Sequence, residues 1–145
     1  MLVLDTNILL YAADRQSEFH GPCRALVEQC LDDPAPDFLT WNICYEFLRV
    51  STHPRVFRSP WNAKDAWRFI EVLLASPGID VLVPTARHAG VLSLVVDELP
   101  EARGNFLHDL HTATLMREHG ISRICTRDTD FHRFSFLTVI DPLRT

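Results

Sequence analysis

The sequence predicts an α/β fold in which a mainly parallel sheet of four to five strands is covered by helices on both faces. Three observations carry this prediction. Short apolar runs of strand length alternate with longer segments whose apolar residues follow helical spacing. Strands that alternate with helices are typical of parallel sheets. The length of 145 residues fits one domain, which we expect to cover residues 1–145.

The first half of the chain opens on an apolar run that ends on a carboxylate, and Thr6 is placed to cap the helix that follows. Asp32-Asp33-Pro34-Ala35-Pro36 ends the next long helix, and His53-Pro54 ends another. The expected segments, in order, are a strand over 2–5, helices over 6–13 and 19–32, a strand over 37–40, a helix from 40 or 41 to 51, and a helix from 62 to 74.

In the second half, Ser76-Pro77-Gly78 is a turn, and Gly120 is a typical residue to follow the last turn of a helix. The expected segments are a strand over 79–83, a helix from 84 or 85 to about 99, a helix over 106–119, a strand over 121–125, and a further strand candidate over 137–140.

Composition narrows the class of protein. A content of 47% hydrophobic and 23% charged residues is ordinary for a globular domain. The net charge of −5 argues against a nucleic-acid binder, which would be basic, unless bound metal cancels several of the acids. Four cysteines form no CxxC pair, no signal peptide is visible, and no apolar run could cross a bilayer. We therefore expect a reduced, cytoplasmic protein with no membrane partner.

Four acidic residues occupy related positions. Asp5 ends the first strand and Asp128 follows the strand over 121–125, so a parallel sheet would bring both to one edge. Glu46 and Asp109 lie within helices at a spacing that puts each beside apolar residues of the same helix face. Asp109 is also in the first turn of its helix, where the helix dipole favours an anion.

Any one of these acids could be a helix cap or a turn residue, but four together predict a metal site. Carboxylates held close together repel one another, and a hard divalent cation removes that repulsion. Mg²⁺ or Mn²⁺ fits best because no set of His and Cys ligands favours zinc. His108 and His111 flank Asp109 without a zinc-binding pattern.

Four segments, in order, resemble the successive motifs of PIN-domain nucleases, and most closely the VapC toxins of bacterial toxin–antitoxin pairs. They are Asp5-Thr6-Asn7, the helix carrying Asn42 and Glu46, the helix carrying His108-Asp109 and Ala113, and Thr126-Arg127-Asp128-Thr129-Asp130-Phe131. The tail containing Asp141-Pro142-Leu143 is similar to one VapC subgroup. The resemblance implies a single PIN domain with a PIN-like three-layer α/β/α architecture.

The resemblance also implies roles for individual residues. The catalytic quartet would be Asp5, Glu46, Asp109 and Asp128, with metal held by Asp5, Asp109 and Asp128 and with Asn7 and Thr126 supporting the site. Asp130 is a further supporting acid, and the choice between Asp128 and Asp130 as the main fourth acid stays open.

The implied activity is that of a Mg²⁺- or Mn²⁺-dependent endoribonuclease, the toxin of a type II system, which cleaves single-stranded RNA by metal-activated water. The implied partners are RNA, a second copy of the chain and a VapB-type antitoxin. A groove for single-stranded RNA needs cations and stacking aromatics at its rim. The candidates are Arg49, Arg127, Trp41 and Trp61.

Two other functions fit parts of the pattern. A haloacid-dehalogenase-like phosphatase uses an aspartate at the end of its first strand as nucleophile and needs a second aspartate two residues later, where this chain has Asn7. A non-catalytic PIN scaffold would bind RNA or protein without cutting. Such scaffolds often lose acidic residues of the quartet, and this chain keeps all four.

Overall fold

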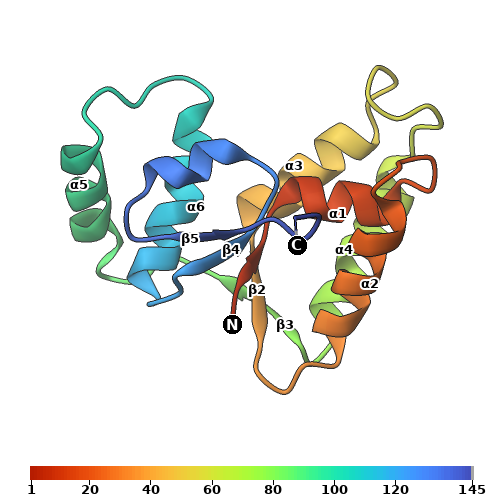
Figure 1. The fold of residues 1–145 in the computed structure, drawn as a ribbon, viewed down its shortest axis with the longest axis horizontal. Helices are drawn as coiled ribbons and strands as arrows, with labels where there is room; N and C mark the ends of the chain where they lie inside the picture. Colours follow the sequence, from red (N-terminus) through yellow and green to blue (C-terminus); the bar gives the residue numbers. More distant parts are fainter. Residues whose placement is uncertain (145) are drawn as a thin grey trace.

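The five strands form one sheet in the order β3-β2-β1-β4-β5, and all neighbouring pairs are parallel (Figure 1). A computed structural model describes residues 1–144 of the chain. The predicted α/β class with a parallel sheet is confirmed, and the strand candidate near the C-terminus is the fifth strand. The strands are β1 (Val3–Leu4), β2 (Asp37–Thr40), β3 (Ile79–Leu82), β4 (Arg123–Cys125) and β5 (Thr138–Ile140).

Six α-helices and one 3₁₀ helix connect these strands within residues 1–144. None of these helices combines the length and the apolar character needed to cross a membrane. The helices are α1 (Thr6–Ala13), α2 (His20–Leu31), α3 (Trp41–Ser51), α4 (Ala63–Ala75), α5 (His88–Glu98), α6 (Phe106–Glu118) and the 3₁₀ helix η1 (Thr129–Arg133).

The helix predicted over residues 6–13 is confirmed as α1, but its predicted cap is wrong, and so is the predicted start of α5. Asp5, not Thr6, is the N-cap of α1, because the Asp5 carboxylate accepts a hydrogen bond from the Thr6 amide at 2.8 Å. The helix expected from residue 84 or 85 begins only at His88. Its start is delayed because both the amide and the hydroxyl of Thr85 donate to the side chain of Glu118 in α6.

The helices form two groups around the sheet, which gives the expected three-layer α/β/α arrangement. α1 packs against α2 and α3, and α3 packs against α4, whereas α5 packs against α6. In Figure 1, α5 and α6 lie toward one end of the molecule, and α2 and α4 lie toward the other. The core between the layers is apolar and includes the fully buried side chains of Leu4, Leu39, Phe47, Leu115 and Ile124.

The strand order creates a crevice at the carboxyl ends of β1 and β4. The chain moves from β1 outward through β2 to β3, and then crosses back to β4 on the other side of β1. In open α/β sheets, ligands bind at such a reversal point, outside the carboxyl ends of the strands. The backbone amide of Asp5 donates to the Cys125 carbonyl at 3.0 Å, so the ends of both strands are fixed together.

Glu118, in the last turn of α6, fastens the start of α5. Its side chain is buried and accepts hydrogen bonds from Thr85 and, at 2.6 Å, from Nδ1 of His88. Burial alone would raise the pKa of this carboxyl, but the hydrogen bonds from Thr85 and His88 outweigh it and lower the pKa to about 2. Nothing in the local sequence pattern distinguishes Glu118 from an ordinary exposed helix residue.

Gly78 is required by close packing rather than by backbone conformation. A Cβ atom at this position would lie 2.0 Å from the carbonyl oxygen of Cys30 and 2.7 Å from that of Leu31. Because both obstacles are backbone atoms, we expect Gly78→Ala to lower the free energy of unfolding by at least about 3 kcal/mol. Gly90→Ala is the control, since its Cβ would meet no atom within 4 Å and its helix α5 should gain up to about 1 kcal/mol. Chemical denaturation measures both, and equal stability of the two variants would contradict this packing.

Candidate metal centre

An acidic cavity of about 700 Å³ opens between α3, the start of α6 and η1. It lies at the carboxyl-terminal edge of the sheet, where the strand order predicts a ligand site. Four carboxylates and one arginine contribute to its wall. The lining residues are Asn42, Tyr45, Glu46, Arg49, Asn105, Phe106, His108, Asp109, Asp128 and Asp130.

Three aspartates form the tightest acidic group among residues 1–144. Asp109, Asp128 and Asp130 each bring one carboxylate oxygen within 4.8 Å of the others. Asp109 comes from the first turn of α6, and Asp128 is the N-cap of η1, where it accepts from the Asp130 amide at 2.9 Å. Three carboxylate oxygens at this separation suit a hard divalent cation with oxygen ligands. The structure therefore includes Asp130 in the group together with Asp128.

Asp5 lies beside this group and is held by three hydrogen bonds. Its carboxylate accepts from the Thr6 amide at 2.8 Å, the Thr126 hydroxyl at 2.7 Å and the Asn7 side-chain amide at 3.2 Å. Thr126 is itself buried, directly after β4. The position of Asp5 is thus fixed by both strands that border the crevice.

Asn7 and Thr126 extend this support to the loop that carries the other acids. The Asn7 side chain donates to the Thr126 hydroxyl at 2.9 Å and accepts from the Arg127 amide at 3.2 Å. The Thr126 hydroxyl also accepts from the Asp128 amide at 2.9 Å. The two polar residues therefore set the distance between Asp5 and Asp128.

Burial and the neighbouring acids raise the pKa values of Asp5 and Asp109. Burial raises the pKa of Asp5 to about 6, against the opposing hydrogen bonds from Thr126 and Thr6, and the negative charges of Asp128 and Glu46 add to the rise. The pKa of Asp109 rises to about 7, first through burial and then through the charges of Asp128, Asp5, Asp130 and Glu46. The negative charges of Asp128 and Glu46 thus act on both Asp5 and Asp109.

Glu46 lines the cavity but is more open than the inward position expected from its helix pattern. Its side chain is 40% exposed and pairs with Nη2 of Arg49 at 3.1 Å, one turn further along α3. It also lies outside the tight group of three aspartates. Glu46 therefore stands at the rim of the site, with Arg49 beside it.

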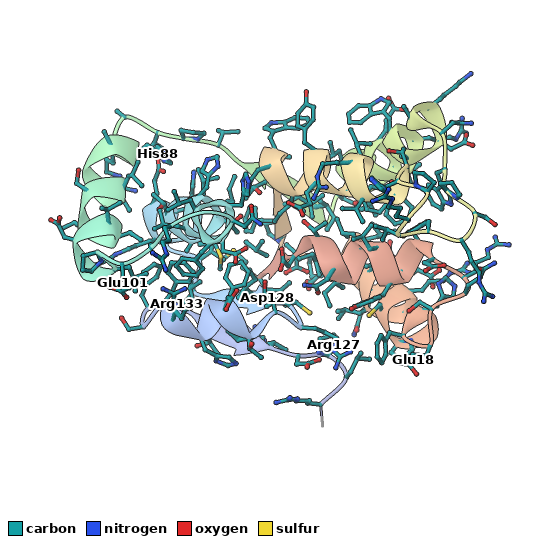
Figure 2. The ribbon with its side chains drawn as sticks, turned by 90° about the horizontal axis from the view of Figure 1, so that it is seen from above. Glu18, His88, Glu101, Arg127, Asp128 and Arg133 are labelled. Carbon is teal, nitrogen blue, oxygen red and sulfur yellow. The ribbon has the colours of Figure 1, made fainter. Side chains whose placement is uncertain are left out.

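The other candidates for RNA contact differ in their placement. The Arg127 guanidinium lies 4.3 Å from the Phe19 ring centre, and its Nε is 3.6 Å from Asp141, so this side chain turns away from the cavity. Figure 2 places Arg127 between Asp128 and Glu18. Trp41 is exposed at the start of α3 but is not part of the cavity wall.

Trp61 belongs to an aromatic cluster with Phe47, Phe57 and Phe69 rather than to the acidic cavity.

Conversely, Tyr45 was not predicted as a site residue, although it is 69% exposed and lines the cavity. Its position directly before Glu46 is the only sequence signal that could have identified it.

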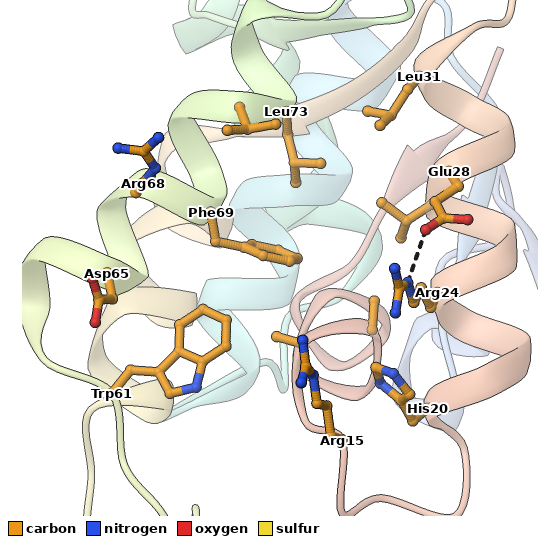
Figure 3. A pocket seen from close by; sticks show the side chains of 14 residues that line it. Arg15, His20, Arg24, Glu28, Leu31, Trp61, Asp65, Arg68, Phe69 and Leu73 are labelled. Carbon is orange, nitrogen blue, oxygen red and sulfur yellow. Dashed lines mark hydrogen bonds and ion pairs between the residues drawn. The ribbon is translucent and has the colours of Figure 1, made fainter.

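A second, more apolar groove of about 560 Å³ lies between α2 and α4 (Figure 3). Val27, Leu31, Phe69 and Leu73 form its apolar wall. Its carboxylates do not converge on a point, and Glu28 is already paired with a neighbouring arginine, Arg24, at 2.8 Å. The groove therefore lacks the donor set of a metal site, and the acidic cavity is the better candidate for chemistry.

Comparisons with known proteins agree with this geometry. Residues 2–137 match the PIN domain family. The chain is 33% identical to ribonuclease VapC48 of Mycobacterium tuberculosis over 95% of its own length and 94% of the relative's. It is 33% identical to ribonuclease VapC43 of the same species, over 99% and 96%. The structure of VapBC2 from Rickettsia felis, bound to a promoter DNA fragment, has a similar fold, with a TM-score of 0.68 and 16% identity over 96% of each chain.

The raised pKa values predict how the stability of the metal-free protein depends on pH. The folded protein keeps protons on Asp5 and Asp109 at pH values where the unfolded chain has released them. The free energy of unfolding should therefore fall as pH rises from about 4 to about 7, by a few kcal/mol, since one pKa unit corresponds to about 1.4 kcal/mol. Denaturation in EDTA across this range measures the effect.

Asp109→Asn is the matching variant, because it removes one of the two titrating groups. We expect a shallower pH dependence and, at pH 7 without metal, a stability no lower than that of the wild type. Added Mg²⁺ should stabilise the wild type more than the variant. A large loss of stability in metal-free Asp109→Asn would show that Asp109 supports the fold instead.

Proposed function

Because the chain belongs to the VapC ribonucleases of the PIN-domain family, we propose that it is a metal-dependent endoribonuclease and the toxin of a VapBC-type pair. One observation carries the proposal beyond family membership. Carboxylates from α6 and η1 converge at the edge of the sheet, with Asp5 and Glu46 close enough to raise the pKa of Asp109. No member of the predicted quartet is missing.

We propose that Asp109, Asp128 and Asp130 hold one Mg²⁺ or Mn²⁺ ion, with Asp5 beside them. The donors are carboxylate oxygens alone, which favours these hard cations over zinc. When bound, such a cation lowers the pKa of a coordinated water and offsets the charge that grows on a phosphodiester.

The remaining acidic residues position the cation site and accept a proton from the attacking water. The Asp5 carboxylate accepts hydrogen bonds from Thr126 and Asn7, which hold it in place beside the cation site. We therefore assign Asp5 a fixed, positioning role at that site. Glu46 is the carboxylate of the cavity wall that lies outside the group of three, and we assign it to accept the proton of the attacking water. No side-chain nucleophile is required.

The shape of the site favours single-stranded RNA. Exposed Tyr45 offers a ring on which a base can stack, and Arg49 offers a positive charge at the same rim. The phosphatase alternative loses support, because Asn7 hydrogen-bonds Asp5 at the position where a second aspartate is needed. A scaffold that binds without cutting would have no need for the coupled acids.

We further propose that the protein is a single PIN domain that forms a homodimer, binds a VapB-type antitoxin and is located in the cytoplasm. The proposal of an antitoxin rests on family membership, and the Rickettsia felis structure is of such a VapBC pair.

Loss of one acid should abolish cleavage without unfolding the protein. We expect Asp5→Ala and Asp109→Asn to lower the rate of RNA cleavage in Mg²⁺ by at least about 100-fold, because each disturbs the position or charge of the cation site. Asp97→Asn, an exposed change of the same kind on α5, should leave the rate unchanged. Wild-type rates in both site variants would refute the assignment, and cleavage that persists in EDTA would refute the metal dependence.

Expression of the chain in a bacterial host should arrest growth, and co-expression of the neighbouring open reading frame should relieve the arrest. Mapping new RNA 5′ ends during the arrest should reveal discrete cleavage sites and thus identify the substrate. The Asp109→Asn variant is the control, since it should bind the same partner yet leave growth and RNA ends unaltered. Arrest by this variant would indicate toxicity that does not depend on cleavage.

A further inference from the structure

Two arginines line a cavity that adjoins the acidic one. This cavity, which is separate from the groove between α2 and α4, is lined by Pro100, Glu101, Ala102, Arg103 and Arg133. Phe106 connects the two, because its ring is part of the acidic wall and the Arg133 guanidinium carbon lies 3.7 Å from the centre of that ring. A single aromatic ring therefore separates the guanidinium of Arg133 from the acidic cavity. In Figure 2, Arg133 lies between Glu101 and Asp128.

The helix η1 contributes one lining residue to each of the two cavities. It carries both Asp130, in the acidic group, and Arg133, three residues later. In a 3₁₀ helix, residues three apart lie on the same side, about 6 Å apart along the axis. The short helix therefore links the acidic group to Arg133 within three residues of backbone.

Arg133 is held in place before any ligand binds. The Phe106 ring on which it lies is stacked on Phe134, with ring centres 5.1 Å apart and planes 11° apart. The flat guanidinium is thus supported by a rigid aromatic platform, and its edge remains available for bidentate contact with a phosphate. The nearest carboxylate is that of Glu101, at 3.9 Å and 66% exposed, which makes it a weak partner.

The negative charge of the acidic cavity is a reason to expect positive groups beside it. When ionised, Asp5, Glu46, Asp109, Asp128 and Asp130 carry more negative charge than one divalent cation and Arg49 together can offset. An RNA strand that reaches the cation must pass this charge, so fixed positive groups next to the cavity would favour its approach. Arg103 and Arg133 are the arginines that line the neighbouring cavity.

We propose that Arg133, assisted by Arg103, binds the phosphate next to the one that is cleaved. The inference rests on the proposed ribonuclease function and specifies how the same site takes its substrate. Arg133 supplies bidentate hydrogen bonds from its aromatic platform, and Arg103 adds charge from the loop before α6. Glu101 is only a weak partner of Arg133 in the free protein and yields to the phosphate.

The first test measures kcat/KM on an RNA fragment that spans a mapped cleavage site. Arg133→Gln and Arg103→Gln should each lower kcat/KM about fivefold to tenfold, chiefly through KM, and lessen its dependence on salt concentration. Arg133→Lys should be intermediate, since it keeps the charge but not the bidentate geometry. Arg123→Gln is the control, because this exposed arginine begins β4 at the opposite edge of the sheet. Glu101→Gln should change kcat/KM in the opposite direction, raising it about twofold.

The second test replaces single phosphates of that fragment by neutral methylphosphonates. Neutralising the phosphate next to the cleaved one should reduce wild-type kcat/KM by about the same factor as Arg133→Gln, and should add little further loss in that variant. Independent losses at every position would overturn the proposal, as would Arg133→Gln and Arg103→Gln rates equal to those of Arg123→Gln. Thermal denaturation identifies loss of fold in Arg133→Gln, in which case exposed Arg103 decides the outcome.

The two proposals fail in different ways. If the wild-type protein cleaves no RNA in Mg²⁺ or Mn²⁺, the ribonuclease function fails and the phosphate subsite with it. If the wild type cleaves RNA and the arginine variants match the control, the ribonuclease function stands and the subsite alone is refuted.

Discussion

The hydrogen bonds that link the ends of β1 and β4 are the constraint on which the site depends. Asp5 is bonded to Thr126, and Asn7 is bonded to both, so the first carboxylate cannot move away from the others. Mutual repulsion would otherwise spread the acids apart, as the raised pKa values of Asp5 and Asp109 indicate. The hydrogen bonds thus hold the acids in an arrangement in which their negative charges repel one another, and the proposed divalent cation would reduce this repulsion.

Helix α6 shows how one element serves both the site and the fold. Asp109, in its first turn, faces other carboxylates, and its pKa rises to about 7. Glu118, in its last turn, faces the donors of Thr85 and His88, and its pKa falls to about 2. The same functional group therefore lies among other carboxylates at one end of the helix and accepts structural hydrogen bonds at the other. Anchoring at Glu118 keeps the opposite end of α6 in register with the acidic cavity.

The sequence predicted features that arise from local patterns. Alternating apolar runs gave the parallel sheet, and the position of Asp5 after an apolar run located the edge at which acids meet. Features made by contacts distant in sequence were missed. The delayed start of α5 depends on Glu118, 33 residues beyond Thr85. The open position of Glu46 depends on how α3 meets the cavity, which helical spacing alone does not specify.

The net charge of the whole chain is a poor guide to whether this fold can bind a nucleic acid. A charge of −5 argues against a nucleic-acid ligand when the chain is treated as one average surface. The fold instead gathers coupled acids in one cavity and places Arg133 and Arg103 in the next, with only the Phe106 ring between them. What decides whether a polyanion can approach is the potential along its path, and η1 carries an acid of one cavity, Asp130, and an arginine of the other, Arg133. A chain with an acidic total can therefore present a surface suited to a phosphate backbone.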